Sequence, residues 1–213
     1  MGFDWRRAIT PSLFTFGTAV SVTGIVIVLG RHGWSARPAA AVLVVLYLLW
    51  VLSEAPVSLG RPSTPPREVS TLICYGLSRF ATVAAAEFLL PVAGGTTVRE
   101  VLAFALFAGG VTLRTVAIRT LGRFYSHHVI KHDAHAIVST GPYTFIRHPA
   151  YAGMLLANVG LVVFFLNWYS VLLLAVLATV LSWRIRVEEK TLGELPAYQV
   201  YASQHSRLVP GIW

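Results

Sequence analysis

Apolar residues are grouped along this chain in long blocks with few charges inside them. A helix needs about 20 mostly apolar residues to cross a bilayer, and each block comes close to that length. We therefore predict six transmembrane helices, at about residues 11–30, 39–59, 71–93, 98–118, 149–167 and 168–187.

The polar segments between the blocks predict how these helices connect. The proline-rich segment GRPSTPPRE (60–68) cannot continue a helix and separates the second block from the third. The last two blocks are separated by little more than NWYS (167–170), so they should form a tight helical hairpin with Trp168 and Tyr169 at the membrane interface. The more polar segment 188–206 is expected to form a helix on the membrane surface.

Composition supports an integral membrane protein. Of the 213 residues, 55% are hydrophobic and 12% are charged, and the mean hydropathy is +0.66. A soluble domain usually has about twice that charged fraction. The single cysteine, Cys74, excludes an internal disulfide and a cysteine-rich metal site. Residues 11–30 are longer than the apolar part of a typical signal peptide, so we interpret them as a transmembrane helix.

The basic residues predict how the chain is oriented. The net charge of +8 would suit nucleic-acid binding, but it is also typical of membrane proteins with basic cytoplasmic segments. If the N-terminus faces the cytoplasm, the predicted outer loops contain Arg31, Arg37 and Arg99, Arg79 lies within a span, and all other lysines and arginines are on the inner side. We therefore expect both termini in the cytoplasm and no nucleic-acid partner.

Three charged residues, Glu54, Arg79 and Glu87, fall inside predicted spans, where a charge is costly and usually faces the interior of the bundle. They could line a polar cavity for a ligand head group. Alternatively, Arg79 pairs with one of the acids and fixes the packing of the helices, and this is the interpretation that we favour.

Histidines are concentrated in segment 119–149, which contains His127, His128, His132, His135 and His148. Membrane di-iron enzymes also use clustered histidines, but they need several histidine clusters on different helices and this chain has one. We therefore predict no metal site, and we interpret His127, His128 and His132 as solvated or interfacial loop residues.

The segment STGPYTFIRHPAYAG (139–153) has the features of a ligand site. Pro149 suits the first position of a helix, whose free amides can bind a carboxylate or a phosphate. Gly141 and Pro142 predict a tight turn, and Tyr143 and Tyr151 offer ring faces for a base or a cation. A ligand with an aromatic ring, a carboxylate and a positive centre would fit, and S-adenosylmethionine has all three.

The last block ends in RIRVEEKTL (184–192), where Arg184 and Glu188 are spaced i, i+4 and Arg186 and Glu189 i, i+3. On a helix these spacings predict two ion pairs, which at an exposed helix end stabilise the fold little. The short hairpin, however, should bring this helix end close to residue 149. We therefore expect these side chains to converge with segment 135–151 on one cytoplasmic pocket.

The chain combines several motifs in one order: DAHAIVSTGPYTFIRHPAYAG (133–153), the short hairpin, RIRVEEKTL (184–192) and YQVYASQHSRLVPGIW (198–213). Together they resemble the isoprenylcysteine carboxyl methyltransferase family, a membrane group that also includes the phospholipid N-methyltransferases. The resemblance covers about residues 113–213 and implies a catalytic region there, after N-terminal transmembrane helices in 1–112. It implies an S-adenosylmethionine-dependent enzyme whose lipophilic substrate arrives from the bilayer. By position, Arg184 and Arg186 are implied on the acceptor side, and the cofactor would be bound by His135, Val138, Gly141, Tyr143, His148, Pro149, Tyr151, Glu188 and Glu189.

The acceptor itself stays open at this point. An isoprenylcysteine-like carboxylate is the leading hypothesis, followed by a phospholipid or another lipophilic amine, thiol or hydroxyl compound. A sterol-reductase-like enzyme using NADPH is a more distant alternative, and a lipid-binding scaffold is a non-enzymatic one. The Ala-, Val- and Leu-rich composition suggests a GC-rich bacterial genome and therefore a bacterial plasma membrane.

Overall fold

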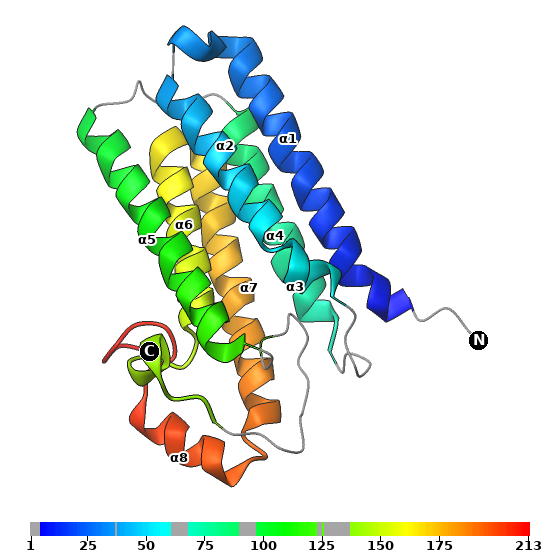
Figure 1. Cartoon of the computed structure of the whole chain (residues 1–213), viewed down its shortest axis with the longest axis vertical. Helices are drawn as coiled ribbons and strands as arrows, with labels where there is room; N and C mark the ends of the chain where they lie inside the picture. Colours follow the sequence, from blue (N-terminus) through cyan, green and yellow to red (C-terminus); the bar gives the residue numbers. More distant parts are fainter. Residues whose placement is uncertain (1–4, 37, 61–67, 90–96, 123–124, 126–136) are drawn as a thin grey trace.

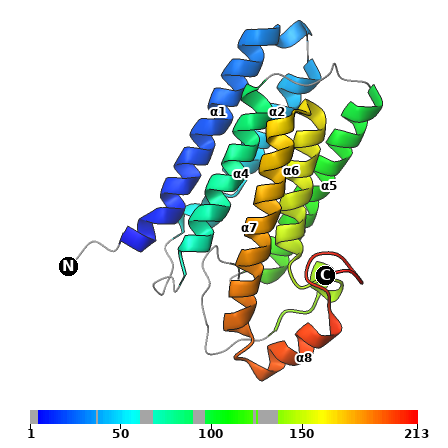
Figure 2. The same cartoon turned by 180° about the vertical axis from the view of Figure 1, so that it is seen from behind.

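The computed structural model describes residues 5–36, 38–60, 68–89, 97–122, 125 and 137–213. This part of the chain is helical and contains no strand, apart from an isolated bridge between Ile146 and Ser206. The elements are η1 (Trp5–Ala8), α1 (Ile9–Ala36), α2 (Pro38–Ser53), α3 (Ala55–Leu59), α4 (Ser70–Phe88), α5 (Thr97–Leu121), η3 (Gly141–Thr144), α6 (Pro149–Phe165), α7 (Trp168–Leu192) and α8 (Pro196–Gln204). The long helices run side by side in a bundle, and the start of α1 and the C-terminal segment lie toward the same end of it (Figures 1 and 2).

Each of the six predicted blocks forms a helix, and the protein is an integral membrane protein of the helical kind. Within the described residues, α1 over Ile9–Arg31, α5 and α7 are long and apolar enough to cross a membrane, whereas α2 and α6 are shorter apolar helices. The arrangement therefore agrees with a polytopic helix bundle, and the number of crossings stays a prediction.

The predicted helix 39–59 is interrupted at Glu54, which separates α2 from the short α3. Pro56 explains the break, because proline has no amide hydrogen to continue the hydrogen-bonding pattern of α2. The chain then restarts with bonds from the amides of Val57 and Ser58 to the carbonyl of Glu54, at 3.2 and 3.0 Å. The break sets the carboxylate of Glu54 inside the bundle, where its side chain is almost fully buried.

Helix α5 packs very closely against α6. A β-carbon added to Gly110 would lie 2.3 Å from the backbone nitrogen of Ala157, and one added to Gly153 would lie 2.5 Å from that of Arg114. Small residues allow this approach, as they do in many membrane helix pairs. The contact matters for function because it fixes the first turns of α6 beside Arg114 of α5.

Polar groups fasten the turn between α6 and α7, where Leu166 and Asn167 alone separate the two helices as the predicted hairpin requires. The side chain of Asn167 accepts a hydrogen bond from the amide of Ser170 at 2.9 Å and donates one to the carbonyl of Ala85 in α4, also at 2.9 Å. Trp168 and Tyr169 follow directly and are exposed, as expected for residues at a membrane interface.

The chain after α7 differs from the predicted single surface helix. Helix α7 continues to Leu192, five residues past the predicted end of the span, and a turn then leads into the separate α8. Pro196 explains the new start, since proline suits the first turn of a helix. As a result, Glu188 and Glu189 lie on the last turns of α7, directly below the bundle.

Candidate functional site

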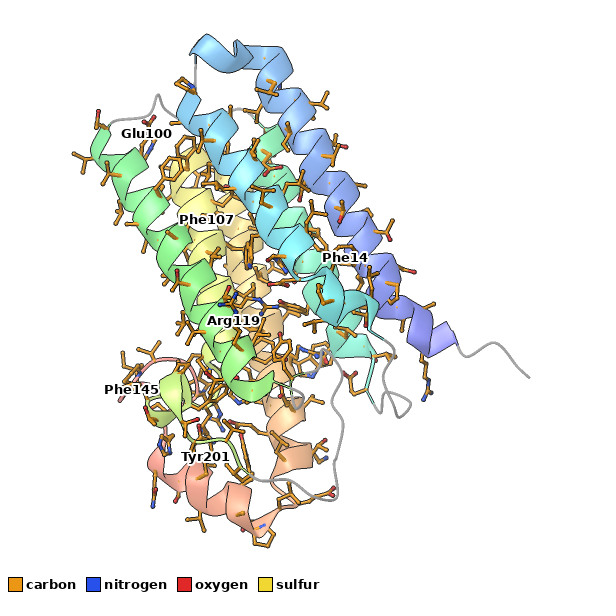
Figure 3. All side chains as sticks on the ribbon, viewed as in Figure 1. Phe14, Glu100, Phe107, Arg119, Phe145 and Tyr201 are labelled. Carbon is orange, nitrogen blue, oxygen red and sulfur yellow. The ribbon has the colours of Figure 1, made fainter. Side chains whose placement is uncertain are left out.

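The described residues of segment 137–153, the end of α7, α8 and the C-terminal segment meet at one end of the bundle (Figure 1). Arg119, Phe145 and Tyr201 mark this end in Figure 3, whereas Glu100 marks the opposite one. We call the meeting point of these elements the lower end.

Backbone hydrogen bonds join the C-terminal segment to the entrance of α6. The amide of Arg147 donates to the carbonyl of Ser206 at 2.8 Å, and the amide of His148 donates to the carbonyl of Arg207 at 3.0 Å. The phenol of Tyr201 in α8 donates to the carbonyl of Tyr143 at 2.7 Å. These bonds position His148 immediately before Pro149, which is the first residue of α6.

Glu189 is the centre of a cluster of two arginines and a histidine. One carboxylate oxygen lies 3.0 Å from Nη1 of Arg147 and 3.1 Å from Nε2 of His148. The other accepts a hydrogen bond from Nε of Arg207 at 2.7 Å. With 10% of its side chain exposed, Glu189 binds together α7, the entrance of α6 and the C-terminal segment.

Tyr151 connects a second carboxylate to a buried arginine. Its hydroxyl donates to Oε2 of Glu188 at 3.0 Å and accepts from Nε of Arg184 at 2.9 Å. Arg184 is 2% exposed, and its Nη1 donates to Oγ1 of Thr71 in α4 at 3.0 Å. The side chains of α4, α6 and α7 thus form one hydrogen-bonded chain that runs into the bundle.

Aromatic rings surround this chain of hydrogen bonds. The rings of His148 and Tyr151 are stacked with centroids 5.8 Å apart, and Tyr75 meets Tyr151 edge to face at 6.2 Å. The guanidinium carbon of Arg184 lies 5.8 Å from the centroid of Tyr75. A ligand at this place would meet ring faces, two carboxylates and an arginine within a short distance.

The turn before α6 is held from both sides. Gly141 has a φ of +57°, a conformation that favours glycine, and a β-carbon there would lie 3.2 Å from Oγ1 of Thr120. Val138 and the buried Tyr143 pack with Ala117 and Ala150 in a small apolar cluster. Burial raises the pKa of the Tyr201 phenol to about 12, although Arg147 nearby acts in the opposite direction. The phenol therefore stays protonated and able to donate to Tyr143.

Comparison with known proteins assigns this part of the chain. Residues 101–194 match the model of the isoprenylcysteine carboxyl methyltransferase (ICMT) family. We call this matched segment, which is less than half of the chain, the ICMT-family region. The predicted family resemblance is confirmed for it, although the match begins earlier than the predicted residue 113 and ends before α8.

Three relatives show how far the ICMT-family similarity extends. A protein-S-isoprenylcysteine O-methyltransferase of Saccharomyces cerevisiae is 40% identical over 102 residues, which are 46% of this chain and 43% of the relative. Protein-S-isoprenylcysteine O-methyltransferase B of Arabidopsis thaliana is 33% identical over 98 residues, 45% of this chain and 48% of the relative. A protein-S-isoprenylcysteine O-methyltransferase of Xenopus laevis is 31% identical over 106 residues, 47% of this chain and 35% of the relative. The chain spans about half the length of the relatives it matches, or less.

Most of the predicted site residues come together at the lower end of the ICMT-family region. His135 lies outside the described residues, and Arg186 of α7 is exposed. His127, His128 and His132 also lie outside the described residues. The residues that the structure brings together are Val138, Gly141, Tyr143, His148, Pro149, Tyr151, Arg184, Glu188 and Glu189.

The predicted pair of Arg186 with Glu189 at the end of α7 is replaced by longer-range contacts. Glu189 pairs with Arg147, His148 and Arg207 instead of Arg186, because the C-terminal segment folds back against α7. The hydroxyl of Tyr151 bridges Arg184 to Glu188. Both glutamates therefore belong to the tertiary structure of the site, and neither one is part of a merely local helix-surface pair.

Several residues of the site were not predicted from the sequence. Thr71 and Tyr75 come from α4, in the half of the chain that has no recognisable motif, and Arg207 comes from the C-terminal segment. Only the structural role of Thr71 at the start of α4 had a local signal, which is Glu68 three residues before it. The carboxylate of Glu68 accepts hydrogen bonds from the amide and the hydroxyl of Thr71. No local pattern indicates that Arg207 reaches Glu189.

Arg114 was counted with the basic residues of the inner side, and the structure adds that it is buried within α5. It is 1% exposed, its Nη2 lies 3.0 Å from Oε2 of Glu54, and its Nη1 donates to the carbonyl of Ala150 at 3.1 Å. Arg79 shares the same carboxylate, with Nη1 at 3.5 Å from Oε2 of Glu54. The favoured buried pair between Arg79 and an acid is therefore confirmed, and Arg114 is a second partner that extends the cluster to the first turn of α6.

Proposed function

We propose that the protein is an S-adenosylmethionine-dependent methyltransferase that methylates the carboxylate of a lipophilic, isoprenylcysteine-like acceptor. The observation that carries this proposal is the Tyr151 hydroxyl, which joins Arg184 to Glu188 inside an ICMT-family region. The names of the relatives support the same activity for the region that they share with this chain.

The cofactor side of the site offers groups of suitable chemistry. Glu188 accepts a hydrogen bond from Tyr151 and is half-buried, so its carboxylate can also hold an ammonium group or ribose hydroxyls. The stacked His148 and Tyr151 rings provide a face for an aromatic base or a sulfonium. Glu189 already contacts Arg147, His148 and Arg207, so we assign it the positioning of His148 and of the C-terminal segment.

Of the two candidate arginines, Arg184 is the better acceptor residue. It lies inside the bundle, where Tyr151 and Thr71 orient its guanidinium, whereas Arg186 is exposed. The planar fork of an arginine binds a carboxylate through two parallel hydrogen bonds. The lipophilic part of the acceptor would then lie among the membrane helices, and the carboxylate would lie at the lower end.

The chemistry requires positioning more than acid–base catalysis. When bound, S-adenosylmethionine supplies a methyl group whose C–S bond breaks, with the electron pair left on sulfur, as a C–O bond to the acceptor forms. A carboxylate acceptor is already ionised at neutral pH, so no protein group has to remove a proton. The residues of this chain hold the acceptor oxygen in line and exclude water from it.

The proposal also assigns an orientation. The elements of the lower end contain Arg147, Arg186, Lys190 and Arg207, and Arg119 of α5 lies toward the same end in Figure 3. Basic residues are typical of the cytoplasmic side of membrane proteins. We therefore place the lower end and both ends of this chain in the cytoplasm, where a soluble cofactor can reach the site.

The first test is a calorimetric titration of the purified protein in detergent with S-adenosylhomocysteine. We expect saturable binding that Glu188→Gln and His148→Ala weaken at least about tenfold, because each removes a charged or ring contact. Arg186→Ala is the matched control and should bind normally. A folded wild-type protein that gives no heat and no thermal shift would contradict the proposed cofactor.

A second test concerns the acceptor. With a farnesylcysteine analogue and labelled cofactor, Arg184→Lys should lower kcat/KM by about a hundredfold, since lysine keeps the charge but loses the fork. Arg186→Ala should stay within a few-fold of wild type. Equal effects of the two substitutions would remove Arg184 as the acceptor residue.

A further inference from the structure

A cavity of about 50 Å³ lies between α1, α2, α3 and α4, away from the cluster around Glu189. Much of its wall is apolar, and Phe14, which Figure 3 labels, comes from α1 at the level of α3. The main apolar lining residues are Leu13, Phe14, Leu72 and Phe80. Glu54, Tyr75 and Arg79 also line the cavity, so its chemistry is mixed.

Among the described residues, the charges beside the cavity do not balance. Arg79 and Arg114 share the single carboxylate of Glu54, and all three side chains are at least nine-tenths buried. With both guanidinium groups and the carboxylate ionised, one positive charge is left over in a low-dielectric environment. Such a charge is costly unless an anion lies close to it.

Glu87 does not supply the missing charge at this place. It lies eight residues after Arg79 in α4, which corresponds to about 12 Å along a helix. Its carboxylate packs against Gly24 of α1, and neither oxygen has a hydrogen-bond partner within the described part of the chain.

Two donors at the cavity are also unused. Nη2 of Arg79 and the hydroxyl of Tyr75 are buried and have no hydrogen-bond partner among the described residues. Each side chain is 5% exposed, and both line the cavity. Buried donors without partners usually indicate a ligand or solvent that completes their hydrogen bonds.

We propose that this cavity binds the carboxylate of a single-chain amphiphile, with Arg79 and Tyr75 as donors and the chain against Leu13, Phe14, Leu72 and Phe80. A carboxylate supplies one negative charge and two acceptor oxygens, which match the one excess charge and the two unused donors. Its small size suits the small cavity, and an alkyl chain suits the apolar wall and the surrounding bilayer. The proposal does not rest on methyltransferase activity, because binding is measurable without turnover.

The site is next to the proposed acceptor residue but separate from it. Tyr75 forms part of the cavity wall, and its ring centroid lies 5.8 Å from the guanidinium carbon of Arg184. Thr71, Tyr75 and Arg79 are spaced four residues apart in α4, so they form one stripe that leads from Arg184 into the cavity. A long-chain carboxylate in the cavity is thus either an acceptor on its way to Arg184 or a resident lipid that is not methylated.

The test uses the full chain in nanodiscs of zwitterionic lipid and the fluorescent fatty acid cis-parinaric acid. We expect saturable binding that palmitate displaces and hexadecanol, which has the same chain without the charge, does not. Arg79→Gln should raise the Kd at least about tenfold and Tyr75→Phe roughly fivefold, since a charged and a neutral donor are lost. Thr82→Ala is the matched control, because Thr82 is buried in α4 and bonds to Ser78 rather than lining the cavity.

Tyr75→Phe keeps the test decisive even if Arg79→Gln fails to fold. Binding that hexadecanol displaces equally well, or that Tyr75→Phe leaves unchanged, would overturn the proposal, as would the absence of saturable binding. Incubation with S-adenosylmethionine distinguishes the two sources of the ligand. A methyl palmitate product identifies the cavity as part of the acceptor route, and bound but unmodified palmitate identifies a resident lipid site.

Discussion

The described part of the chain contains two clusters in which one glutamate is shared by two arginines, and their surroundings differ. Glu189 lies at the lower end with Arg147, Arg207 and His148. Glu54 lies inside the bundle with Arg79 and Arg114. The first cluster joins a chain terminus to a helix end, and the second joins three membrane helices.

The difference shows how burial changes the role of the same groups. At the lower end, where Arg207 is partly exposed, water and counterions can compensate excess positive charge, so we expect opening of the Glu189 cluster to cost less than opening of the Glu54 cluster. Inside the bundle, a guanidinium lacks water and mobile counterions. The Glu54 cluster is therefore expected to be decisive for the fold, whereas the Glu189 cluster is expected to be decisive for ligand binding.

The largest expected effect comes from Glu54→Gln. The neutral amide leaves Arg79 and Arg114 buried without a counter-charge, which typically costs about 3–5 kcal/mol. We expect a strongly lowered thermal midpoint or a loss of folded protein in detergent, measured by unfolding monitored with circular dichroism. Glu100→Gln, at the opposite end of the bundle, should leave the midpoint almost unchanged. A mild effect of Glu54→Gln would break the proposed difference between the clusters.

Glu189→Gln should act locally. It removes the charge that holds Arg147 and Arg207, and hydrogen bonds to charged groups contribute about 1.5–3 kcal/mol each. Hydrogen exchange should increase in residues 206–213 while the bundle helices stay protected, and S-adenosylhomocysteine should bind at least about tenfold more weakly. Glu188→Gln should weaken ligand binding without loosening this segment. If Glu189→Gln lowered the global midpoint as much as Glu54→Gln, the two clusters would not differ as described.

Two neighbouring glycines sharpen the comparison for α5, the helix that carries Arg114. Gly110→Ala forces a methyl group against the backbone of α6 and should destabilise the protein by about 1–3 kcal/mol. In Gly109→Ala the added carbon meets its nearest neighbour, in Leu156, at 4.0 Å, so this change should be neutral or slightly stabilising. Equal thermal midpoints for the two variants would contradict the close packing of α5 and α6.

The smallest expected effect concerns the lower end. Tyr201→Phe removes the hydrogen bond to the carbonyl of Tyr143 and should cost about 1 kcal/mol. The raised pKa of the Tyr201 phenol also predicts how the stability of the protein depends on pH. Between the ordinary phenol pKa of 10.0 and about 12, the unfolded state loses its proton first, so stability should fall as the pH rises through this range. Tyr201→Phe should show a smaller fall than the wild type in pH-dependent unfolding, and an identical fall would exclude Tyr201 as its source.

Much of the fold was predictable from local pattern. The six apolar blocks predicted where the long helices lie. The short NWYS connection between the last two blocks predicted their hairpin. Pro149 predicted the start of α6, because proline is favoured in the first helical turn. The break at Glu54 was missed even though Pro56 signals it, since a long apolar block dominated the interpretation.

The candidate site was predictable only in part. The motifs around His148 and Glu188 indicated which residues gather at the lower end. They did not indicate that Arg207 would hold Glu189 or that Thr71 would hold Arg184, because these pairs are separated by 18 and 113 residues. Contacts across such distances depend on how the helices are arranged, and no periodicity within one segment encodes them.

The sequence by itself determined the helical membrane character, the place of the ICMT-family region and the set of candidate site residues, because hydrophobicity, proline and family motifs act locally. The tertiary structure decided which charges are buried and which are not. Arg114 and Arg186 look alike in the sequence, yet one pairs with Glu54 inside the bundle and the other is exposed. The physical reason is that the energy of a charge depends on its surroundings, and those exist only once the helices have packed.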